Sequence, residues 1–338
     1  MRQAIMTKPG VIEHREVSEP AAGPGQVLLR VKRIGVCGTD LHVYHGKHPF
    51  TPYPVVQGHE FSAVIEAVGS GVANLRPGMK ATATPQEVCG KCRSCRRGDY
   101  HICDHLKVRG FQAPGVAQDL YVTEADKIVP LPDTFTFEQG ALIEPTAVAV
   151  RSTSRAGDMQ GRNVVVLGAG PIGNLVAQVC RCRGAKVLIT DLSDFRLGKA
   201  RDCGVPFQSC ARTESLAQAV KRCFGEEGFD LAFECVGVEA TMSAAVDAIQ
   251  KGGRIVVLGV FGEKPRIDMA VVGEHELSLI GTLMYQHRDY VQAVDLVSRG
   301  KVITDPLVTG HFPFEEYLQA YQFIDKQGDK SLKVMIDL

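Results

Sequence analysis

The sequence predicts an α/β protein made of two domains, a β-rich domain and a doubly wound parallel sheet covered by helices. Up to about residue 150, short apolar segments such as 27–31 and 63–68 are broken by Pro and Gly, as in strands joined by turns. From about residue 160, compact apolar strands alternate with helical stretches, which favours a parallel sheet with both faces covered. A chain of 338 residues also exceeds one ordinary core.

The pattern of expected strands and helices along the sequence also suggests where the domains divide. We expect the β-rich domain to comprise residues 1–150 together with 286–338, because the last fifty or so residues return to a mixed texture. Residues 151–285 then form the parallel-sheet domain. Ligands of such sheets bind beyond the carboxyl ends of the strands, and we expect the active site there, in the cleft between the domains.

The overall composition argues against several classes of function. Lys plus Arg number 38 and Asp plus Glu number 38, so the formal net charge is zero and offers no general attraction to nucleic acid or an anionic membrane. No apolar run is long enough to span a bilayer. The first apolar stretch is short and stopped by Lys8-Pro9-Gly10, unlike a signal peptide, so we expect a cytoplasmic protein that acts on a small molecule.

A glycine-rich turn after the apolar strand at 163–167 predicts a dinucleotide site. Gly168 permits the tight turn, Gly170 lets the backbone approach a pyrophosphate, and Gly173 lets the following helix pack closely on the strand. The helix N-terminus offers free N–H groups to the phosphates, and proline at its first position loses no needed donor. The residues expected to bind the cofactor are Gly168, Gly170, Pro171, Ile172 and Gly173.

An acidic residue at the end of the next strand indicates which dinucleotide binds. Asp191 follows the strand at 186–190, where its carboxylate can accept from both ribose hydroxyls. A carboxylate there repels a 2′-phosphate and so favours NAD over NADP. Arg196 lies five residues further on, where it can stack on the adenine or bind a 2′-phosphate. The sequence therefore predicts NAD, with NADP as the less favoured alternative.

Four of the eleven cysteines lie in one short segment and predict a structural zinc site. Cys89, Cys92 and Cys95 are separated by two residues each, and Cys103 follows after seven. Four thiolates suit tetrahedral Zn²⁺ with no open position, so a substrate has no place on this metal. Disulfide bonds are the alternative, which the expected cytoplasmic location and the crowding disfavour.

Three other residues predict a second, catalytic zinc. Cys37 and the adjacent pair His59 and Glu60 supply a thiolate, an imidazole and a carboxylate. Three protein ligands with an open fourth position are typical of a catalytic zinc. We therefore expect two zinc ions per chain.

These motifs together resemble the zinc-containing medium-chain alcohol dehydrogenase family, in its sorbitol and threonine dehydrogenase branch. The similarity covers essentially the whole chain, through 35–40, 58–60, the four cysteines and the glycine turn, and one departure is Ala63, where the family usually has glycine. The resemblance implies a GroES-like catalytic domain, a Rossmann domain and oxidation of an alcohol by hydride transfer to NAD. It also implies a homodimer or homotetramer joined through the Rossmann sheets.

The resemblance places Glu144 where liver-type alcohol dehydrogenases have a further zinc cysteine. Because Cys37 and Glu60 already neutralise Zn²⁺, a third anionic ligand would make the site net negative. We hypothesise that Glu60 and Glu144 exchange on the metal, directly or through water, as substrate arrives. A plain carboxylate at a helix start is the alternative role for Glu144.

The resemblance also implies a proton path and a pocket. Family members carry a hydroxyl at the position of Thr39, which takes the substrate proton, and a histidine at that of His42, which passes it on through the cofactor ribose. For Thr39 a capping role at a turn is the alternative. Cys37 and His59 complete the expected catalytic set, and Tyr44 is expected to line the substrate pocket.

The sequence narrows the substrate only to a class. Sorbitol dehydrogenases contact the polyol through an Arg-Tyr pair, and here Tyr285 matches while Met284 replaces the arginine. We expect oxidation of a secondary alcohol of a polyol or sugar derivative to a ketone. The alternatives are an L-threonine 3-dehydrogenase and, outside enzymes, a non-catalytic zinc-binding protein of the same fold.

Overall fold

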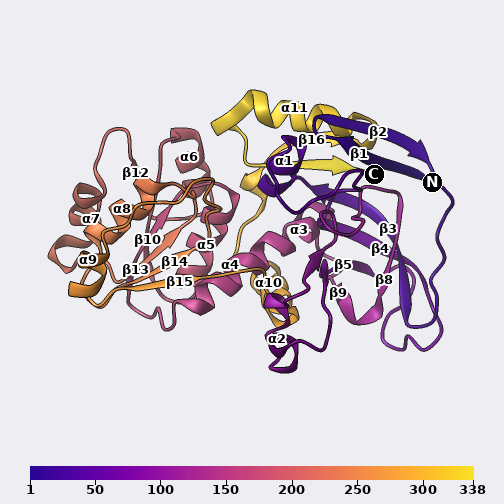
Figure 1. Cartoon of the computed structure of the whole chain (residues 1–338), viewed down its shortest axis with the longest axis horizontal. Helices are drawn as coiled ribbons and strands as arrows, with labels where there is room; N and C mark the ends of the chain where they lie inside the picture. Colours follow the sequence, from indigo (N-terminus) through magenta and orange to yellow (C-terminus); the bar gives the residue numbers. More distant parts are fainter. The chain divides into compact units, whose positions relative to one another are not determined.

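The computed structural model describes every residue from Met1 to Leu338 and divides the chain into two compact units. The first unit comprises Met1–Glu144, Gln286–Ser298 and Val308–Leu338, and the second comprises Pro145–Tyr285 and Arg299–Leu307. Figure 1 shows the helices and strands of both units, coloured along the sequence. Each unit has a buried apolar core of its own.

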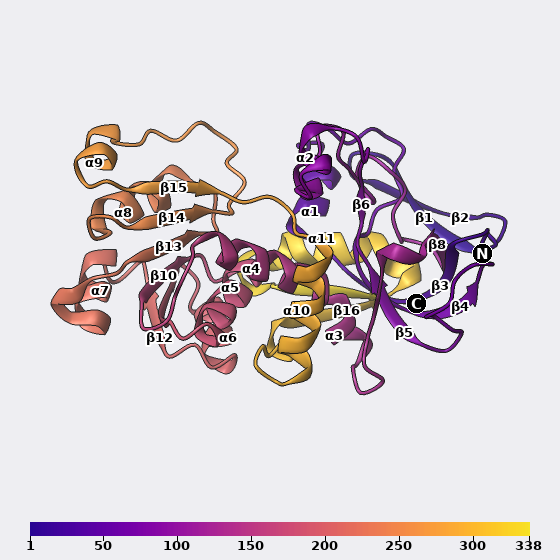
Figure 2. The ribbon, with the colours of Figure 1, turned by 90° about the horizontal axis from the view of Figure 1, so that it is seen from below.

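The second unit is built on a six-stranded parallel sheet, whose strands lie side by side in Figure 2 with β15 at one edge. In spatial order the strands are β12 (Phe207–Cys210), β11 (Lys186–Asp191), β10 (Asn163–Leu167), β13 (Leu231–Glu234), β14 (Arg254–Val257) and β15 (Ser278–Gly281). The first strand in sequence, β10, is thus central, and the order reverses between β10 and β13. This is the strand order of doubly wound dinucleotide-binding sheets, so the predicted fold class of this unit is confirmed.

Helices cover both faces of the parallel sheet, with α7, α8 and α9 on one side of it in Figure 1 and α5 and α6 on the other. Their bounds are α5 (Pro171–Cys182), α6 (Asp194–Asp202), α7 (Leu216–Phe224), α8 (Glu239–Ala248) and α9 (Met269–Glu274). Strand side chains alternate between these layers: Val165 shares a core cluster with Ala219 of α7 and Ala245 of α8, whereas Val166 faces Gly173 of α5. Both faces of β10 are therefore apolar and buried.

Two short segments pack differently from the ranges expected for the domains. Helix α4 (Ile143–Arg155) carries the chain from the first unit into the second, so 145–150 packs with the parallel-sheet unit. Residues 299–307 also pack there, because the Gln178 amide of α5 donates to the Ile303 carbonyl oxygen at 3.0 Å and accepts from the Ile303 N–H at 2.7 Å.

The first unit is built on a seven-stranded sheet in which β8 pairs with β3 beside the path β16-β17-β3-β4-β5-β9. The strands are β3 (Gln26–Gly35), β4 (Glu60–Val68), β5 (Lys80–Ala83), β8 (Leu120–Glu124), β9 (Ile128–Pro130), β16 (Val308–Pro313) and β17 (Lys333–Asp337). Two small sheets pair β1 (Arg2–Lys8) with β2 (Val11–Glu16), and β6 (Gln86–Glu87) with β7 (Lys107–Val108). The β-rich character predicted for this part of the chain is confirmed, and its last strand, β17, lies next to β3.

The helices of the first unit are short except for two. They are α1 (Gly38–Tyr44), α2 (Arg93–Arg96), α3 (Phe137–Ala141), α10 (His287–Ser298) and α11 (Tyr317–Gln327). Tyr317 and Tyr321 of α11 are buried in the core of this unit, which fixes that helix against the strands. None of the helices in the chain has the length and apolar character needed to cross a bilayer.

Candidate zinc and dinucleotide sites

Cys37, His59 and Glu60 come together at one end of the sheet of the first unit. Strands β3 and β4 are antiparallel, and their register pairs Gly35 with Glu60, so the end of β3 lies beside the start of β4. Cys37 then caps the N-terminus of α1. One ligand atom from each of Cys37, His59 and Glu60 lies within 4.8 Å of the other two. A thiolate, an imidazole and a carboxylate at this spacing fit a single Zn²⁺.

A buried carboxylate contacts two of these residues. Asp40 is 1% exposed, accepts from the Cys37 N–H at 2.9 Å, and has an oxygen 3.6 Å from Nδ1 of His59. Because Nδ1 faces the Asp40 carboxylate, Nε2 is the nitrogen better placed to hold a metal. Burial alone would lower the pKa of His59, but Asp40, Cys37 and Glu144 raise it to about 10. The imidazole therefore holds a proton that a metal must displace.

The third residue of the group, Glu60, has a partner that the sequence argument missed. The Lys333 ammonium donates to both Glu60 carboxylate oxygens, at 2.8 and 2.5 Å. The two side chains are only 3% and 1% exposed. Burial alone would lower the pKa of Lys333, but Glu60 and Cys37 reverse this effect and raise it, so the amine stays charged. A lysine within the apolar C-terminal strand was the available sequence signal.

Glu144, Thr39 and His42 lie in the same unit as these ligands. Glu144 is 5% exposed and lies outside the group of ligand atoms, yet its charge acts on His59. Thr39 and His42 lie three residues apart on α1 and so on one face of that helix. Thr39 is half-buried and His42 is exposed.

The two tyrosines expected to contact substrate belong to different units and differ in exposure. Tyr44 is half-buried, and its ring centroid lies 5.3 Å from that of Tyr321 on α11. Tyr285 is completely buried and follows Met284, whose φ is +48°. In this structure Tyr285 therefore has no exposed surface on which a substrate could rest.

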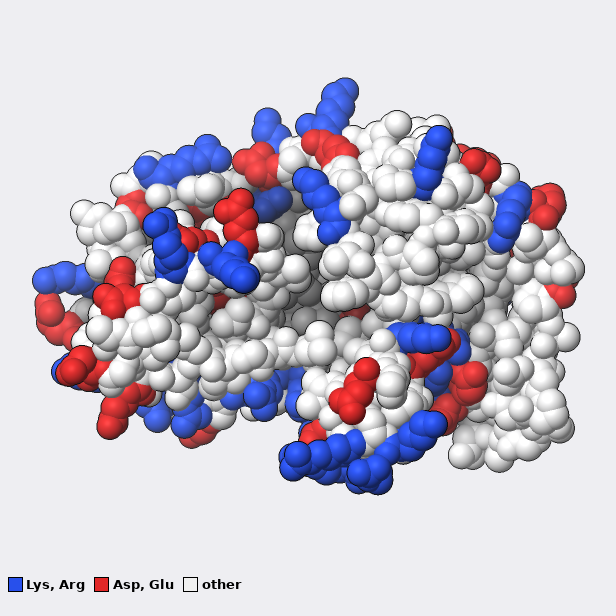
Figure 3. Space-filling view, in the orientation of Figure 1, with Lys and Arg blue, Asp and Glu red and all other residues white.

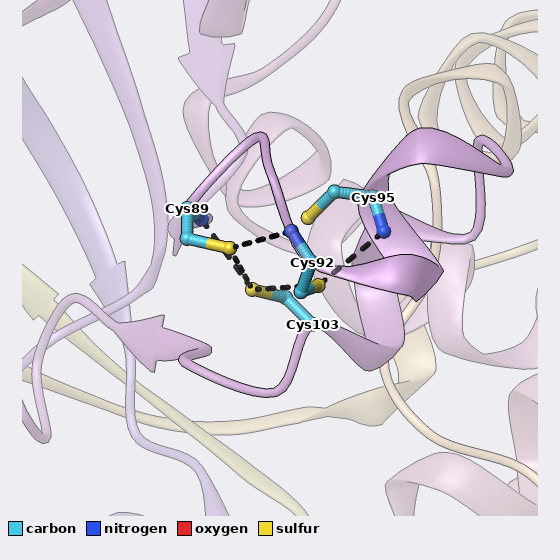
Figure 4. Close-up of side chains that lie close together, drawn as sticks. All are labelled: Cys89, Cys92, Cys95 and Cys103. Carbon is cyan, nitrogen blue, oxygen red and sulfur yellow. Dashed lines mark hydrogen bonds between the residues drawn. The ribbon is translucent and has the colours of Figure 1, made fainter.

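The four cysteines of the other predicted metal site converge from a loop and from α2, as Figure 4 shows. The sulfur of Cys103 lies 3.5 Å from that of Cys89 and 3.9 Å from that of Cys92. A tetrahedral zinc with Zn–S bonds of about 2.3 Å needs sulfurs about 3.8 Å apart, so the four thiols fit that metal. The backbone N–H groups of Cys95 and Asp104 lower the pKa of Cys92 to about 6, which favours a thiolate.

Exposed cations surround the four cysteines, and Figure 3 shows them gathered on the lobe around α2. The residues are Lys91, Arg93, Arg96 and Arg97. Four thiolates with one Zn²⁺ carry two net negative charges, so nearby cations stabilise the loaded site. This local charge also shows that a zero net charge for the whole chain is compatible with strongly charged patches.

The glycine turn of the second unit has the geometry that its sequence predicted. Gly168 has a φ of +99°, and a Cβ on Gly173 would lie 1.8 Å from the Gly168 carbonyl oxygen, so neither position accepts a side chain. A Cβ on Gly170 would meet nothing within 4 Å. The fold itself therefore leaves open space at Gly170, the N-cap of α5, where Pro171 and Ile172 follow. A helix N-terminus with open space above it fits a phosphate group.

Asp191 and Arg196 lie beside this turn. One Asp191 carboxylate oxygen accepts from the Ala169 N–H of the turn at 2.7 Å, and the other accepts from the Ser193 N–H at 2.8 Å. Asp191 thus ties the end of β11 to the glycine turn. Arg196 is half-buried on α6, which begins three residues after Asp191.

A second residue that the sequence argument missed is Glu234, at the end of β13. One of its oxygens accepts from the N–H groups of Val236 and Gly237 and from the Thr241 hydroxyl, while the other is buried without a partner. A Cβ on Gly168 would lie 2.8 Å from the Val236 side chain. Glu234 therefore shapes the loop that packs against the glycine turn.

Comparisons with known proteins match both halves of the chain. Residues 23–133 match the model of the alcohol dehydrogenase GroES-like domain, and residues 171–299 match that of zinc-binding dehydrogenases. The chain is 34% identical to the 2-dehydro-3-deoxy-L-galactonate 5-dehydrogenase of Pseudoalteromonas atlantica, over 95% of this chain and 94% of that protein. It is 32% identical to the sorbitol dehydrogenase of Halalkalibacterium halodurans, over 95% and 94%.

Two further likenesses bear on the alternatives for substrate and cofactor. The chain is 32% identical to an L-threonine 3-dehydrogenase of Rhizobium etli, over 100% of this chain and 98% of that protein. Its structure is similar to that of an alcohol dehydrogenase from Escherichia coli CFT073 complexed with NADH, with a TM-score of 0.91, 28% identity, and coverage of 100% and 99% of the two chains.

Proposed function

The chain belongs to the family of zinc-binding dehydrogenases with an alcohol dehydrogenase GroES-like domain, and from this premise we propose that it oxidises a secondary alcohol of a polyol or sugar derivative to a ketone. The observation that carries the proposal is the buried group of Cys37, His59 and Glu60, which offers three ligands to one zinc. In the proposed enzyme, the four clustered cysteines hold a second zinc with a structural role only.

The proposed hydride acceptor is NAD. Asp191 puts a carboxylate beside the glycine turn, where it repels a 2′-phosphate. Although both of its oxygens accept backbone N–H groups, each keeps a second lone pair for a ribose hydroxyl. The proposed phosphate contacts are the backbone at Gly168, Gly170 and Gly173 and the N-terminus of α5, and Arg196 is proposed to stack on the adenine.

Bound zinc supplies a Lewis acid that makes the substrate hydroxyl more acidic, and NAD accepts the hydride. The residues of the chain hold and move the proton. The Thr39 hydroxyl accepts the substrate proton as it releases its own, and His42, exposed on the same face of α1, passes a proton on toward solvent. Tyr44 is proposed to border the substrate, while the burial of Tyr285 argues for a role behind the pocket wall.

The substrate class rests on the relatives. Two of them are named for a sugar acid and a polyol, and both cover nearly the whole chain. The L-threonine 3-dehydrogenase relative has a similar identity and supports that activity as a second candidate. The replacement of arginine by Met284 removes a polyol contact and favours a substrate other than sorbitol itself.

The proposed enzyme works in the cytoplasm as a homodimer or homotetramer. Strand β15 is an edge of the parallel sheet, and Ser278, Leu279 and Gly281 on it are exposed, so a second copy can extend the sheet. Free thiols that bind zinc suit a reducing compartment. Light scattering on the wild type and on Leu279→Lys tests the assembly. A charge on this edge should prevent a second copy from pairing there, so the measured mass of the assembly should fall toward that of one chain.

One experiment tests the proposed function. Zinc per chain is measured by metal analysis, and NAD reduction is followed with polyols, sugar acids, sugar phosphates and L-threonine. We expect two zinc ions per chain and turnover with a polyol or sugar derivative. Turnover with L-threonine alone would favour the second candidate. One zinc and no turnover with any of these alcohols would instead favour a non-catalytic zinc-binding protein.

A further inference from the structure

The most completely buried ion pair in the first unit joins Lys333 to Glu60. The ammonium has three hydrogens and three acceptors: both Glu60 oxygens, and the Val36 carbonyl oxygen at 3.1 Å. Buried ions are costly unless they are paired and fully hydrogen-bonded, which this lysine is. Such a pair does not form by chance contact of flexible surface side chains.

The backbone around this pair is shaped to admit it. A Cβ on Gly35 would lie 2.6 Å from a Glu60 carboxylate oxygen and 3.4 Å from Cδ of Lys333. Gly35 is the last residue of β3 and the register partner of Glu60. The absence of a side chain at Gly35 therefore leaves the space that the ion pair occupies.

Lys333 touches both chain segments that carry the metal-ligand candidates. Val36 directly precedes Cys37, and Glu60 directly follows His59. Strand β17 pairs with β3, and the Val36 N–H donates to the Val334 carbonyl oxygen at 2.9 Å, which sets Lys333 beside the end of β3. Glu60 therefore has two possible cationic partners. One is the Lys333 ammonium, which it binds in this structure, and the other is a metal ion held together with Cys37 and His59.

We propose that Lys333 is a positioning residue of the catalytic zinc site, which competes with the metal for the Glu60 carboxylate and makes Glu60 a displaceable ligand. This inference rests on the proposed zinc site at Cys37, His59 and Glu60. In the hypothesised exchange of Glu60 and Glu144 on the metal, Lys333 is the cation that binds Glu60 while Glu144 is on the metal. When Glu60 leaves the metal it meets a buried cation, so no buried carboxylate is left unpaired.

The charges around the site agree with this role. Cys37, Glu60 and Glu144 carry three negative charges against the two of Zn²⁺, and the Lys333 ammonium offsets the third, while the further buried carboxylate of Asp40 faces His59. Before metal binds, the same ammonium already pairs with both Glu60 oxygens, so a metal must compete with it for the carboxylate. Removal of the positive charge therefore leaves Glu60 with one strong cationic partner, the metal.

The test measures metal binding directly. Protein with zinc in the four-cysteine site is loaded with Co²⁺ at the second site, and Co²⁺ affinity and the visible Co²⁺ spectrum are recorded for the wild type, Lys333→Met and Lys333→Arg. We expect Lys333→Met to bind Co²⁺ about tenfold more tightly, with a changed spectrum as Glu60 joins the metal. Substitution of residues that orient metal ligands usually weakens binding by about tenfold to a hundredfold, so a gain is the opposite of what loss of an orienting residue gives. Lys333→Arg should keep the affinity and spectrum near those of the wild type. Lys330→Met, an exposed lysine in the turn before β17, is the matched control and should change neither.

The direction of the change separates the proposal from a merely structural role. A lysine that only stabilises β17 would, when removed, weaken Co²⁺ binding, and that result would overturn the inference. The double variant Lys333→Met/Glu60→Gln removes both buried charges and guards against misfolding of the single variant. It should bind Co²⁺ no more tightly than Glu60→Gln alone, and tighter binding would show that the effect does not run through Glu60. If the wild type binds no metal beyond the four-cysteine site, the proposed zinc site itself fails.

Discussion

Single carboxylates around Cys37 differ in role according to what holds them. Asp40 accepts the Cys37 N–H and faces Nδ1 of His59, so it orients ligands. Glu60 is held by Lys333. Glu144 is buried outside the ligand group, and its charge reaches His59 from there. In the proposed site, the three acidic residues Asp40, Glu60 and Glu144 therefore have different parts: orientation, ligation and charge respectively.

Replacement of Glu144 by alanine tests its part in the proposed exchange. We expect kcat to fall about tenfold to a hundredfold, a range typical of residues just outside a metal's ligands, with both zinc ions retained. Steady-state NADH formation and metal analysis measure the two quantities. Glu227→Ala, at an exposed glutamate of the second unit, is the control. Full activity of Glu144→Ala would leave a plain helix-start carboxylate as the better account.

Glu214 gives the second unit a pH-dependent contribution to stability. Arg222 binds both of its oxygens and Ser209 donates to one, and these hydrogen bonds lower the pKa of Glu214 to about 2. Because the folded-state pKa lies below the unfolded value of about 4.3, the contribution is present above that value and is lost as pH falls toward 2. We expect Glu214→Gln to cost about 1 kcal/mol at pH 7 and to show a weaker loss of stability between pH 4.5 and 2 in urea titrations.

At the scale of elements, the glycine turn joins strand and helix by contacts that admit no side chain. The Gly173 position on α5 lies against the Gly168 carbonyl oxygen, and Val166 packs beside it. The close approach sets where the α5 N-terminus stands relative to β10. If the cofactor binds at that N-terminus as proposed, its binding and the packing of the helix depend on the same glycine.

Gly173→Ala tests that joint dependence. A Cβ 1.8 Å from a carbonyl oxygen forces α5 away from β10, so we expect a stability loss of about 3 kcal/mol and weaker NADH binding. Chemical denaturation and NADH fluorescence titration measure the two effects. Gly198→Ala on α6 is the matched control, because a Cβ there meets nothing within 4 Å, and it should raise stability by up to about 1 kcal/mol. Unchanged NADH affinity in Gly173→Ala would separate binding from helix position.

The parts of the fold that follow local rules were predictable from the sequence. The glycine turn and the four-cysteine site are each recognised from residues a few positions apart. The alternation of strands and helices predicted the doubly wound sheet. Lys333 was missed because its partner Glu60 is 273 residues away and only the pairing of β17 with β3 brings them together. The packing of 299–307 with the second unit was missed for the same reason, since it depends on Gln178. Such distant partners cannot be recognised from nearby residues in the sequence, because only the arrangement of strands and helices in the fold brings them together.

At the scale of the whole chain, the four-cysteine lobe, residues 89–103, is hydrogen-bonded to the residues at which the chain re-enters the first unit, Gln286 and His287. The Gln286 amide donates to the Gly98 carbonyl oxygen at 2.9 Å, across 188 residues, and lies 3.1 Å from Nδ1 of His101. The His287 N–H donates to the Tyr100 hydroxyl at 2.6 Å. These hydrogen bonds fix the first residues of α10 to the lobe. A loss of structure in the lobe should therefore also loosen the start of this helix.

Loss of the structural zinc should therefore loosen the start of α10 as well as the lobe. We expect Cys95→Ser to bind one zinc per chain instead of two, to melt at a lower temperature, and to exchange the His287 amide hydrogen faster, because a closed zinc site contributes folding free energy to the loop that carries Tyr100. Metal analysis, calorimetry and hydrogen exchange measure these three changes. Cys210→Ser, at a cysteine of β12 outside both ligand groups, controls for loss of a thiol. If exchange at His287 stayed at the wild-type rate while the zinc was lost, Gln286 and Tyr100 would hold α10 without the metal, and the coupling would be absent.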